Sequence, residues 1–168
     1  MILGYTCPWR MVMELKLLRL DELANRPLTS ELIPGLLDDG LILAIATEGS
    51  GKTFFGIHCG VHVSSGIRWQ GRHVQQGPVV YCIAEGVNYF PFRITTAFDR
   101  IGVSAIDQPF YILPHSINVR SDDDGKITEE LQQLFISISQ LPVEPRLVIF
   151  DTLNRYMPGG DENDQQDC

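Results

Sequence analysis

The chain has 168 residues and a formal net charge of −8, with 44% hydrophobic and 20% charged residues. This length suffices for one domain with a buried core, and the composition is that of an ordinary globular protein. The negative charge argues against a chain-wide electrostatic attraction to nucleic acid. No stretch of the sequence reaches the roughly 18 apolar residues that a membrane-spanning helix needs, and the N-terminus lacks a signal-peptide pattern. We therefore expect a cytoplasmic protein with no membrane partner.

Helices and strands are expected to alternate along most of the chain. In chain order they are a helix at 14–25, a strand at 41–46, a helix at 52–65, a strand at 78–86, a helix at 87–101, a short strand at 109–114, a helix within 121–141 and a strand at 146–153. The helix at 52–65 has apolar residues at a period of about 3.6, and Gly66 is its expected C-terminal cap. The run VVYCI is apolar on both faces, which is typical of a parallel strand covered on both sides. The order of elements predicts an α/β fold with a mostly parallel sheet.

A glycine-rich segment follows the first expected strand. Residues 46–53 read ATEGSGKT and match the phosphate-binding pattern G-x-x-x-x-G-K-[ST], except that Ala46 replaces the first glycine. In such a loop, backbone amides and the start of the next helix bind an anion. Lys52 is expected to reach the β- and γ-phosphates of ATP, where it is also a catalytic candidate, and Thr53 to bind Mg²⁺. The predicted nucleotide-binding residues are Ala46, Thr47, Glu48, Gly49, Ser50, Gly51, Lys52, Thr53 and Phe54. The alternative is a glycine-rich turn with a surface lysine.

Two acidic residues follow apolar strands, at the edge where parallel sheets of α/β proteins bind ligands. Asp151 ends the run LVIFD and is the expected second anchor of Mg²⁺. Glu85 ends VVYCIAE and could orient or deprotonate an attacking water. An acid after a strand can also simply cap a turn. The phosphate loop favours the metal role for Asp151 and leaves both interpretations of Glu85 open.

Several other polar side chains have simpler interpretations. His58 and His62 stand at i, i+4, a spacing that could bind a metal, but the sequence shows no clear third ligand. Arg68, Arg72 and Trp69 could contact nucleic acid by charge and stacking. A surface connector with a half-buried tryptophan is the favoured interpretation of that segment.

The cysteines show no paired spacing. They are Cys7, Cys59, Cys82 and Cys168. Cys59 and Cys82 fall in apolar patterns and are expected to be buried free thiols. The acidic residues at 122–124 lack the spacing of a calcium-binding loop, and residues 159–167 are expected to form an exposed turn and helix start rather than a second metal site.

Three longer segments together resemble one family of ATPases. The segments WQGRHVQQGPVVY, GPVVYCIAEG and PRLVIFDTLNRYMPGGDEND are similar to those of RepA-type hexameric replicative helicases, a RecA-like branch of the AAA ATPases. The likeness covers about residues 28–167. It implies a three-layer RecA-like core, ATP and Mg²⁺ as cofactors, a ring of six copies and single-stranded DNA as a partner. By position it implies Lys52 and Thr53 as phosphate-loop residues, Glu85 as the catalytic glutamate and Asp151 as the metal-associated aspartate, with Ala46 as a departure.

The same resemblance suggests that part of the core is missing. In RecA-like cores a later strand, tipped by a polar sensor residue, lies between the phosphate-loop strand and the aspartate strand. This chain stops at Cys168, soon after the aspartate strand. We expect an N-terminal extension and helix at 1–27 and a RecA-like domain at 28–168 that lacks this strand, the sensor, any arginine finger and the DNA-facing loops. A sheet without its inner strand exposes apolar edges.

Two functions from different classes follow from these observations. The first is a motor that couples ATP hydrolysis to work on DNA. The second is a binding module that holds ATP or a partner subunit without efficient turnover. A P-loop kinase acting on a small molecule is a third interpretation, which the sequence supports less because it shows no arginine-rich lid.

Overall fold

The structure is a computed structural model that describes residues 19–24, 31–38, 40–120 and 126–156. The chain divides into two compact units, Met1–Ser30 and Glu31–Cys168. Within the residues described, no helix is long and apolar enough to span a membrane. The acidic segment at 122–124, the C-terminal segment at 159–167, Cys7 and Cys168 lie outside the described residues.

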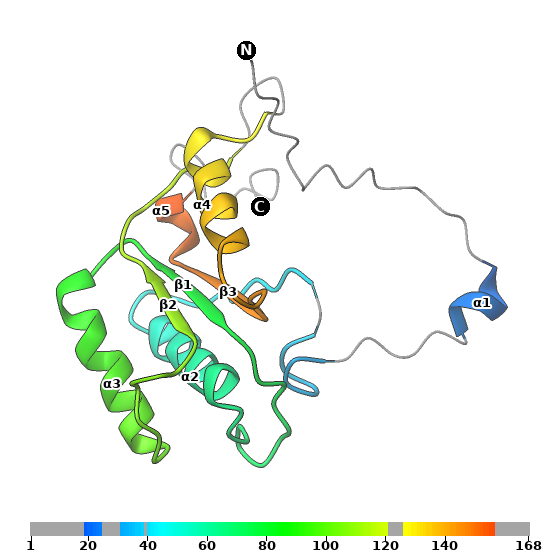
Figure 1. Ribbon diagram of the computed structural model, residues 1–168, viewed down its shortest axis with the longest axis horizontal. Helices are drawn as coiled ribbons and strands as arrows, with labels where there is room; N and C mark the ends of the chain where they lie inside the picture. Colours follow the sequence, from blue (N-terminus) through cyan, green and yellow to red (C-terminus); the bar gives the residue numbers. More distant parts are fainter. Residues whose placement is uncertain (1–18, 25–30, 39, 121–125, 157–168) are drawn as a thin grey trace. The chain divides into compact units, whose positions relative to one another are not determined.

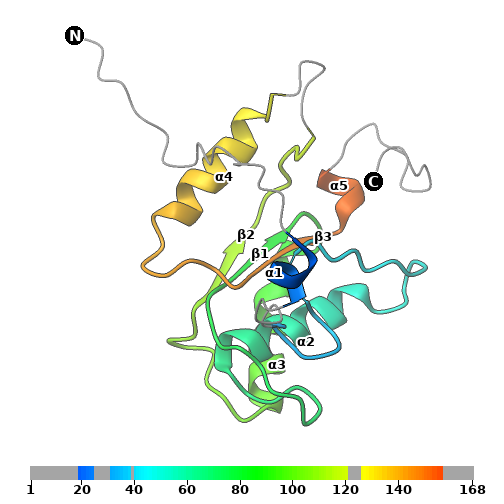
Figure 2. The same ribbon diagram turned by 90° about the vertical axis from the view of Figure 1, so that its right-hand side faces the viewer.

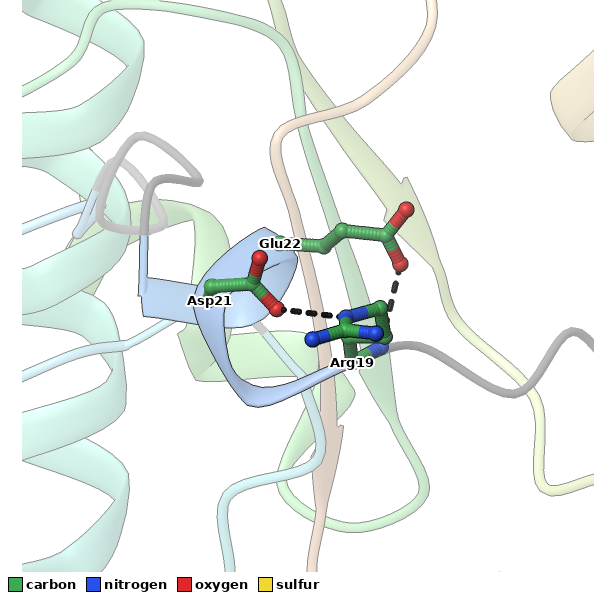
Figure 3. Close-up of polar contacts among 3 residues, drawn as sticks. All are labelled: Arg19, Asp21 and Glu22. Atoms are coloured by element: carbon green, nitrogen blue, oxygen red, sulfur yellow. Dashed lines mark hydrogen bonds and ion pairs between the residues drawn. The ribbon is translucent and has the colours of Figure 1, made fainter.

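The described part of the first unit is the short helix α1 (Leu20–Ala24). It lies within the helix expected at 14–25, whose first residues are outside the description. The Arg19 Nε donates to Asp21 Oδ1 at 3.1 Å, and the Arg19 amide donates to Glu22 Oε2 at 3.0 Å (Figure 3). Both acids stand in the first turn, where a carboxylate favours helix formation. These contacts are local to the helix.

The second unit contains the alternating elements that the sequence predicts from residue 52 onward. They are α2 (Lys52–Ser65), β1 (Val79–Ile83), the 3₁₀ turn η1 (Val87–Tyr89), α3 (Phe90–Arg100), β2 (Phe110–Leu113), α4 (Glu129–Ser139) and β3 (Leu147–Asp151), followed by the short helix α5 (Leu153–Tyr156), which the sequence did not predict. Helix α2 has its predicted bounds, and Gly66 caps it in the left-handed conformation. The strand order is β2-β1-β3, and both pairings are parallel (Figure 1). The predicted α/β fold with a parallel sheet is confirmed.

The central strand β1 is buried along its whole length, as its apolar run predicts. Tyr81 and Ile83 pack with residues of α2 and α3 on one face of the sheet. Val80 and Cys82 pack with residues of α4 and α5 on the other face. The unit therefore has three layers, helix, sheet and helix, which Figures 1 and 2 show from two sides. Cys59 and Cys82 are buried free thiols, as expected.

The strand predicted at 41–46 does not form, and this prediction is wrong. The side chains of Leu41 and Ile45 are 101% and 83% exposed, although their aliphatic pattern resembles that of β1. A strand needs a neighbour to satisfy its backbone groups. Within the described residues none of the three strands pairs with this segment, and β3 pairs only through its edge toward β1. The segment thus leads into the phosphate loop as exposed chain without regular secondary structure.

Candidate nucleotide-binding site

The candidate phosphate loop turns sharply into α2. Gly49 and Gly51 have φ angles of 75° and 96°, a left-handed conformation that glycine adopts without steric cost. The Ser50 amide donates to the Thr47 carbonyl at 3.2 Å, which closes the turn. Helix α2 begins at Lys52, and its N-cap Gly51 offers no side chain to the first amides. Those amides have no partner within the helix, so the helix start presents donors and a positive dipole end to an anion.

The Lys52 ammonium folds back over its own loop. Its Nζ donates to the Ala46 carbonyl and, at 3.1 Å, to the Thr47 carbonyl. A Cβ atom placed on Gly49 or on Gly51 would meet nothing within 4 Å, so the space beside the loop is open. Open space, uncapped amides and a lysine held nearby fit the phosphates of a nucleotide.

Asp151 lies next to the start of α2 although 98 positions separate it from Thr53 (151 − 53). It ends β3 and is 8% exposed. Its Oδ2 accepts a hydrogen bond of 2.8 Å from the Tyr81 hydroxyl, whose oxygen is also 3.4 Å from the Thr53 carbonyl oxygen. The Asp151 carboxylate and the backbone carbonyl of Thr53 therefore lie beside one hydroxyl group. The predicted Mg²⁺ ligands, the Asp151 carboxylate and the Thr53 side-chain hydroxyl, are oxygen donors, which Mg²⁺ prefers.

Glu85 stands at the same end of the sheet. Ile83 pairs with Asp151 in the parallel register of β1 and β3, and Glu85 follows two residues later. Its carboxylate is exposed and forms an ion pair with Arg155 of α5. The structure thus places Glu85 near the strand ends and gives its charge a partner that the sequence did not reveal.

The remaining predicted binding residues lie on an exposed surface. Residues 46–50 are exposed, Glu48 among them, and Phe54 is 62% exposed. The Arg93 guanidinium lies 5.4 Å from the centre of the Phe54 ring, a cation–π contact between α3 and α2. A shallow hollow of about 490 Å³ lies elsewhere, lined by Thr95, Asp99 and residues 102–106 at the end of α3. It shares no residue with the phosphate loop.

The histidine and tryptophan cluster serves packing. The Trp69 indole N–H donates to His58 Nδ1 at 2.9 Å, and His62 Nδ1 lies 2.9 Å from the Ile67 carbonyl oxygen. Trp69 is 8% exposed, so its ring faces are not available for stacking on a base. No group of three or more His, Cys, Asp or Glu residues that could hold a metal occurs in the part of the chain that the structure describes. The connector interpretation of this segment is the one the contacts favour.

Sequence reasoning missed three residues of the site: Tyr81, Gly56 and Arg155. Tyr81 had a usable signal, since a hydroxyl in the middle of a buried strand must find a hydrogen-bond partner. Gly56 is required because a Cβ there would lie 2.9 Å from the Tyr81 hydroxyl oxygen. No local pattern pointed to Arg155.

A parallel α/β sheet, a glycine loop that opens a helix and an aspartate at a strand end define the P-loop class of nucleotide-binding domain. A family model described as an AAA domain matches residues 11–168. The chain belongs to this family, and so carries a P-loop domain of the AAA ATPase class. No curated protein matches the chain, and neither does any solved structure.

Proposed function

We propose that the chain binds ATP and Mg²⁺ at residues 46–54 and couples ATP hydrolysis to work on DNA, as in RepA-type replicative helicases. Single-stranded DNA as a partner, a ring of six copies and a cytoplasmic location belong to this proposal. Membership of the AAA family supports the ATPase class. The finer assignment depends on the likeness of the segments around Glu85 and Asp151 to that helicase family.

One observation carries the nucleotide site. The start of the helix after the glycine loop and the aspartate of β3 meet at the Tyr81 hydroxyl, which is 2.8 Å from Asp151 Oδ2 and 3.4 Å from the Thr53 carbonyl oxygen. A glycine-rich turn with a surface lysine does not require a buried carboxylate beside it. A cation site at the end of the phosphate loop does require one.

The residues have separate tasks in this proposal. The amides at the start of α2 and the Lys52 ammonium would bind phosphate oxygens, and Lys52 would exchange the Ala46 and Thr47 carbonyls for them. Thr53 and Asp151 would hold Mg²⁺, which supplies neutralisation of developing charge on the phosphates. Glu85 would orient a water and accept its proton.

The experiment compares the wild type with Lys52→Ala in binding a fluorescent ATP analogue. We expect binding to weaken roughly tenfold or more, because a lost hydrogen bond to a charged group costs about 1.5–3 kcal/mol. Lys126→Ala removes a lysine outside the loop and serves as the matched control. Equal affinities of the wild type and Lys52→Ala would remove Lys52 from the site.

The ion pair between Glu85 and Arg155 favours a second candidate function. The ion pair occupies a carboxylate oxygen that a water activator would need, which suits a module that binds nucleotide without efficient turnover. Steady-state ATP hydrolysis with and without single-stranded DNA separates the two. Hydrolysis that rises with DNA and disappears in Lys52→Ala supports the motor, whereas Lys52-dependent binding without hydrolysis supports the module.

A further inference from the structure

Tyr81 lies in the apolar layer between the sheet and helices α2 and α3. It is 0% exposed, and it lies in one apolar cluster with Ile57 and Phe90. The centre of its ring is 4.7 Å from that of Phe90 and 6.2 Å from that of Phe110. A phenylalanine would fill this volume equally well, so packing alone does not account for the hydroxyl.

The hydroxyl connects the two halves of the candidate site. It donates to Asp151 Oδ2 at 2.8 Å, its shorter and stronger contact, and its oxygen lies 3.4 Å from the Thr53 carbonyl oxygen. The phenol is thus the donor in this contact, and the carboxylate is the acceptor.

Helix α2 is shaped to admit this hydroxyl. Thr53 and Gly56 stand three residues apart and so lie on one face of the helix. A Cβ on Gly56 would be 2.9 Å from the Tyr81 hydroxyl oxygen and 3.6 Å from Ile149 Cγ2. Both contacts are with residues of the sheet, so Gly56 sets how closely the helix approaches the Tyr81–Asp151 hydrogen bond.

We propose that Tyr81 is a positioning residue for the divalent cation: its hydroxyl fixes the Asp151 carboxylate relative to the start of α2. This inference rests on the proposed nucleotide site and adds a residue to it. A hydrogen bond to a carboxylate ligand fixes its rotamer before the cation arrives, so the ligand need not be ordered on binding. Tyr81 itself contributes no ligand atom in this role.

The test measures how binding of a fluorescent ATP analogue depends on Mg²⁺ in wild type and Tyr81→Phe. We expect Tyr81→Phe to raise the Mg²⁺ concentration for half-maximal effect by about tenfold, the lower end for loss of a group that orients a metal ligand. Affinity for the analogue in EDTA should stay within about twofold, because the phosphate contacts come from the loop. Tyr156→Phe is the matched control, since it removes a buried hydroxyl that donates to the His115 carbonyl at 3.3 Å.

A second pair of variants keeps the phenol. Gly56→Ala places a Cβ against the Tyr81 hydroxyl, whereas Gly60→Ala in the same helix places one 2.8 Å from Phe110 Cε2. We expect Gly56→Ala, but not Gly60→Ala, to raise the Mg²⁺ requirement. In an Asp151→Asn background, Tyr81→Phe should have no further effect on the Mg²⁺ dependence.

Each other outcome overturns the inference. An unchanged Mg²⁺ requirement in Tyr81→Phe would do so, and so would equal shifts in Tyr81→Phe and Tyr156→Phe. A similar loss of affinity with and without Mg²⁺ would show a purely structural role for the hydroxyl. A wild-type protein that binds the analogue with Lys52 dependence but without Mg²⁺ dependence overturns only this inference. A wild-type protein that binds no analogue overturns the proposed function as well.

Discussion

At the scale of single residues, the ion pair of Glu85 and Arg155 is unusual for a candidate water activator. Both side chains are exposed, at 59% and 62% respectively, so water screens their attraction. Exposed pairs of this kind contribute little to stability, about 0–1 kcal/mol. The pair therefore matters more for the position of the Glu85 carboxylate than for the fold.

This leads to a prediction for Arg155→Gln. If the chain hydrolyses ATP, the variant should raise kcat a few-fold, because the Glu85 carboxylate is no longer held by Arg155 and can orient a water. Glu85→Gln should lower kcat by about 10²-fold or more. Both are read from steady-state hydrolysis at saturating ATP and Mg²⁺, with Arg100→Gln as a control for loss of an exposed positive charge. A lower kcat in Arg155→Gln would show that the pair supports turnover instead of restraining it.

At the scale of elements, the exposed segment 41–46 and helix α2, which has one buried face, differ in the packing that holds them. Ile45 is 83% exposed, whereas Ile57 of α2 is 2% exposed. Ile57→Ala should lower the free energy of unfolding by about 2–5 kcal/mol, because it leaves a cavity between helix and sheet. Ile45→Ala should change it by about 0.5 kcal/mol or less.

Urea denaturation of the two variants checks this directly. Both variants replace isoleucine by alanine, so the comparison isolates the effect of burial on the free energy of unfolding. A comparable loss in Ile45→Ala would show that the segment before the phosphate loop is covered in solution, for example by another strand.

An element could be predicted when the signal for it lies in its own local sequence. Helix α2 could be placed to the residue because glycines precede and follow a helical apolar period. Strand β1 could be predicted from five consecutive apolar residues, VVYCI, all of which are buried. The run at 41–46 carries the same local signal, yet a strand also needs a partner, and pairing is not a local property.

In the candidate site, too, some features could be predicted from local patterns and others could not. The loop residues and both acids could be chosen from the sequence because they follow strands in known patterns, although their roles remain predictions. The hydrogen bond from Tyr81 to Asp151 joins residues 70 positions apart, and the pair of Glu85 and Arg155 spans the same separation. Such contacts are set by the strand order β2-β1-β3, which local patterns do not contain.

At the scale of the whole Glu31–Cys168 unit, β1 lies between two helical layers. Each side of the sheet has one buried thiol, whose reactivity can show whether the helical layer on that side is folded. Cys59 belongs to a cluster with Leu37 and Trp69, and Cys82 to one with Leu134 across the sheet. Burial raises the pKa of Cys59 to about 11 and that of Cys82 to about 12. Thiolates are the reactive form, so both groups should resist alkylation at pH 8 in the folded protein.

With Cys7 and Cys168 replaced by serine, labelling of the two remaining thiols across a urea series tests whether the layers unfold together. Because β1 contributes side chains to both clusters, we expect Cys59 and Cys82 to become reactive at the same urea concentration. Earlier exposure of Cys82 would instead make the α4 layer a separate unfolding unit.

The two buried thiols also make the stability of the fold depend on pH in the alkaline range. Each folded pKa lies above the ordinary value of 9.0, so folding favours the protonated thiol. Their contribution is fully present below about pH 9, and it is lost as the pH rises toward the folded values of about 11 and 12. Urea midpoints should therefore fall between pH 8 and pH 10, and less so when Cys82 is replaced by alanine. A midpoint that rises over this range would mean that Cys82 is not held as a buried thiol between β1 and α4.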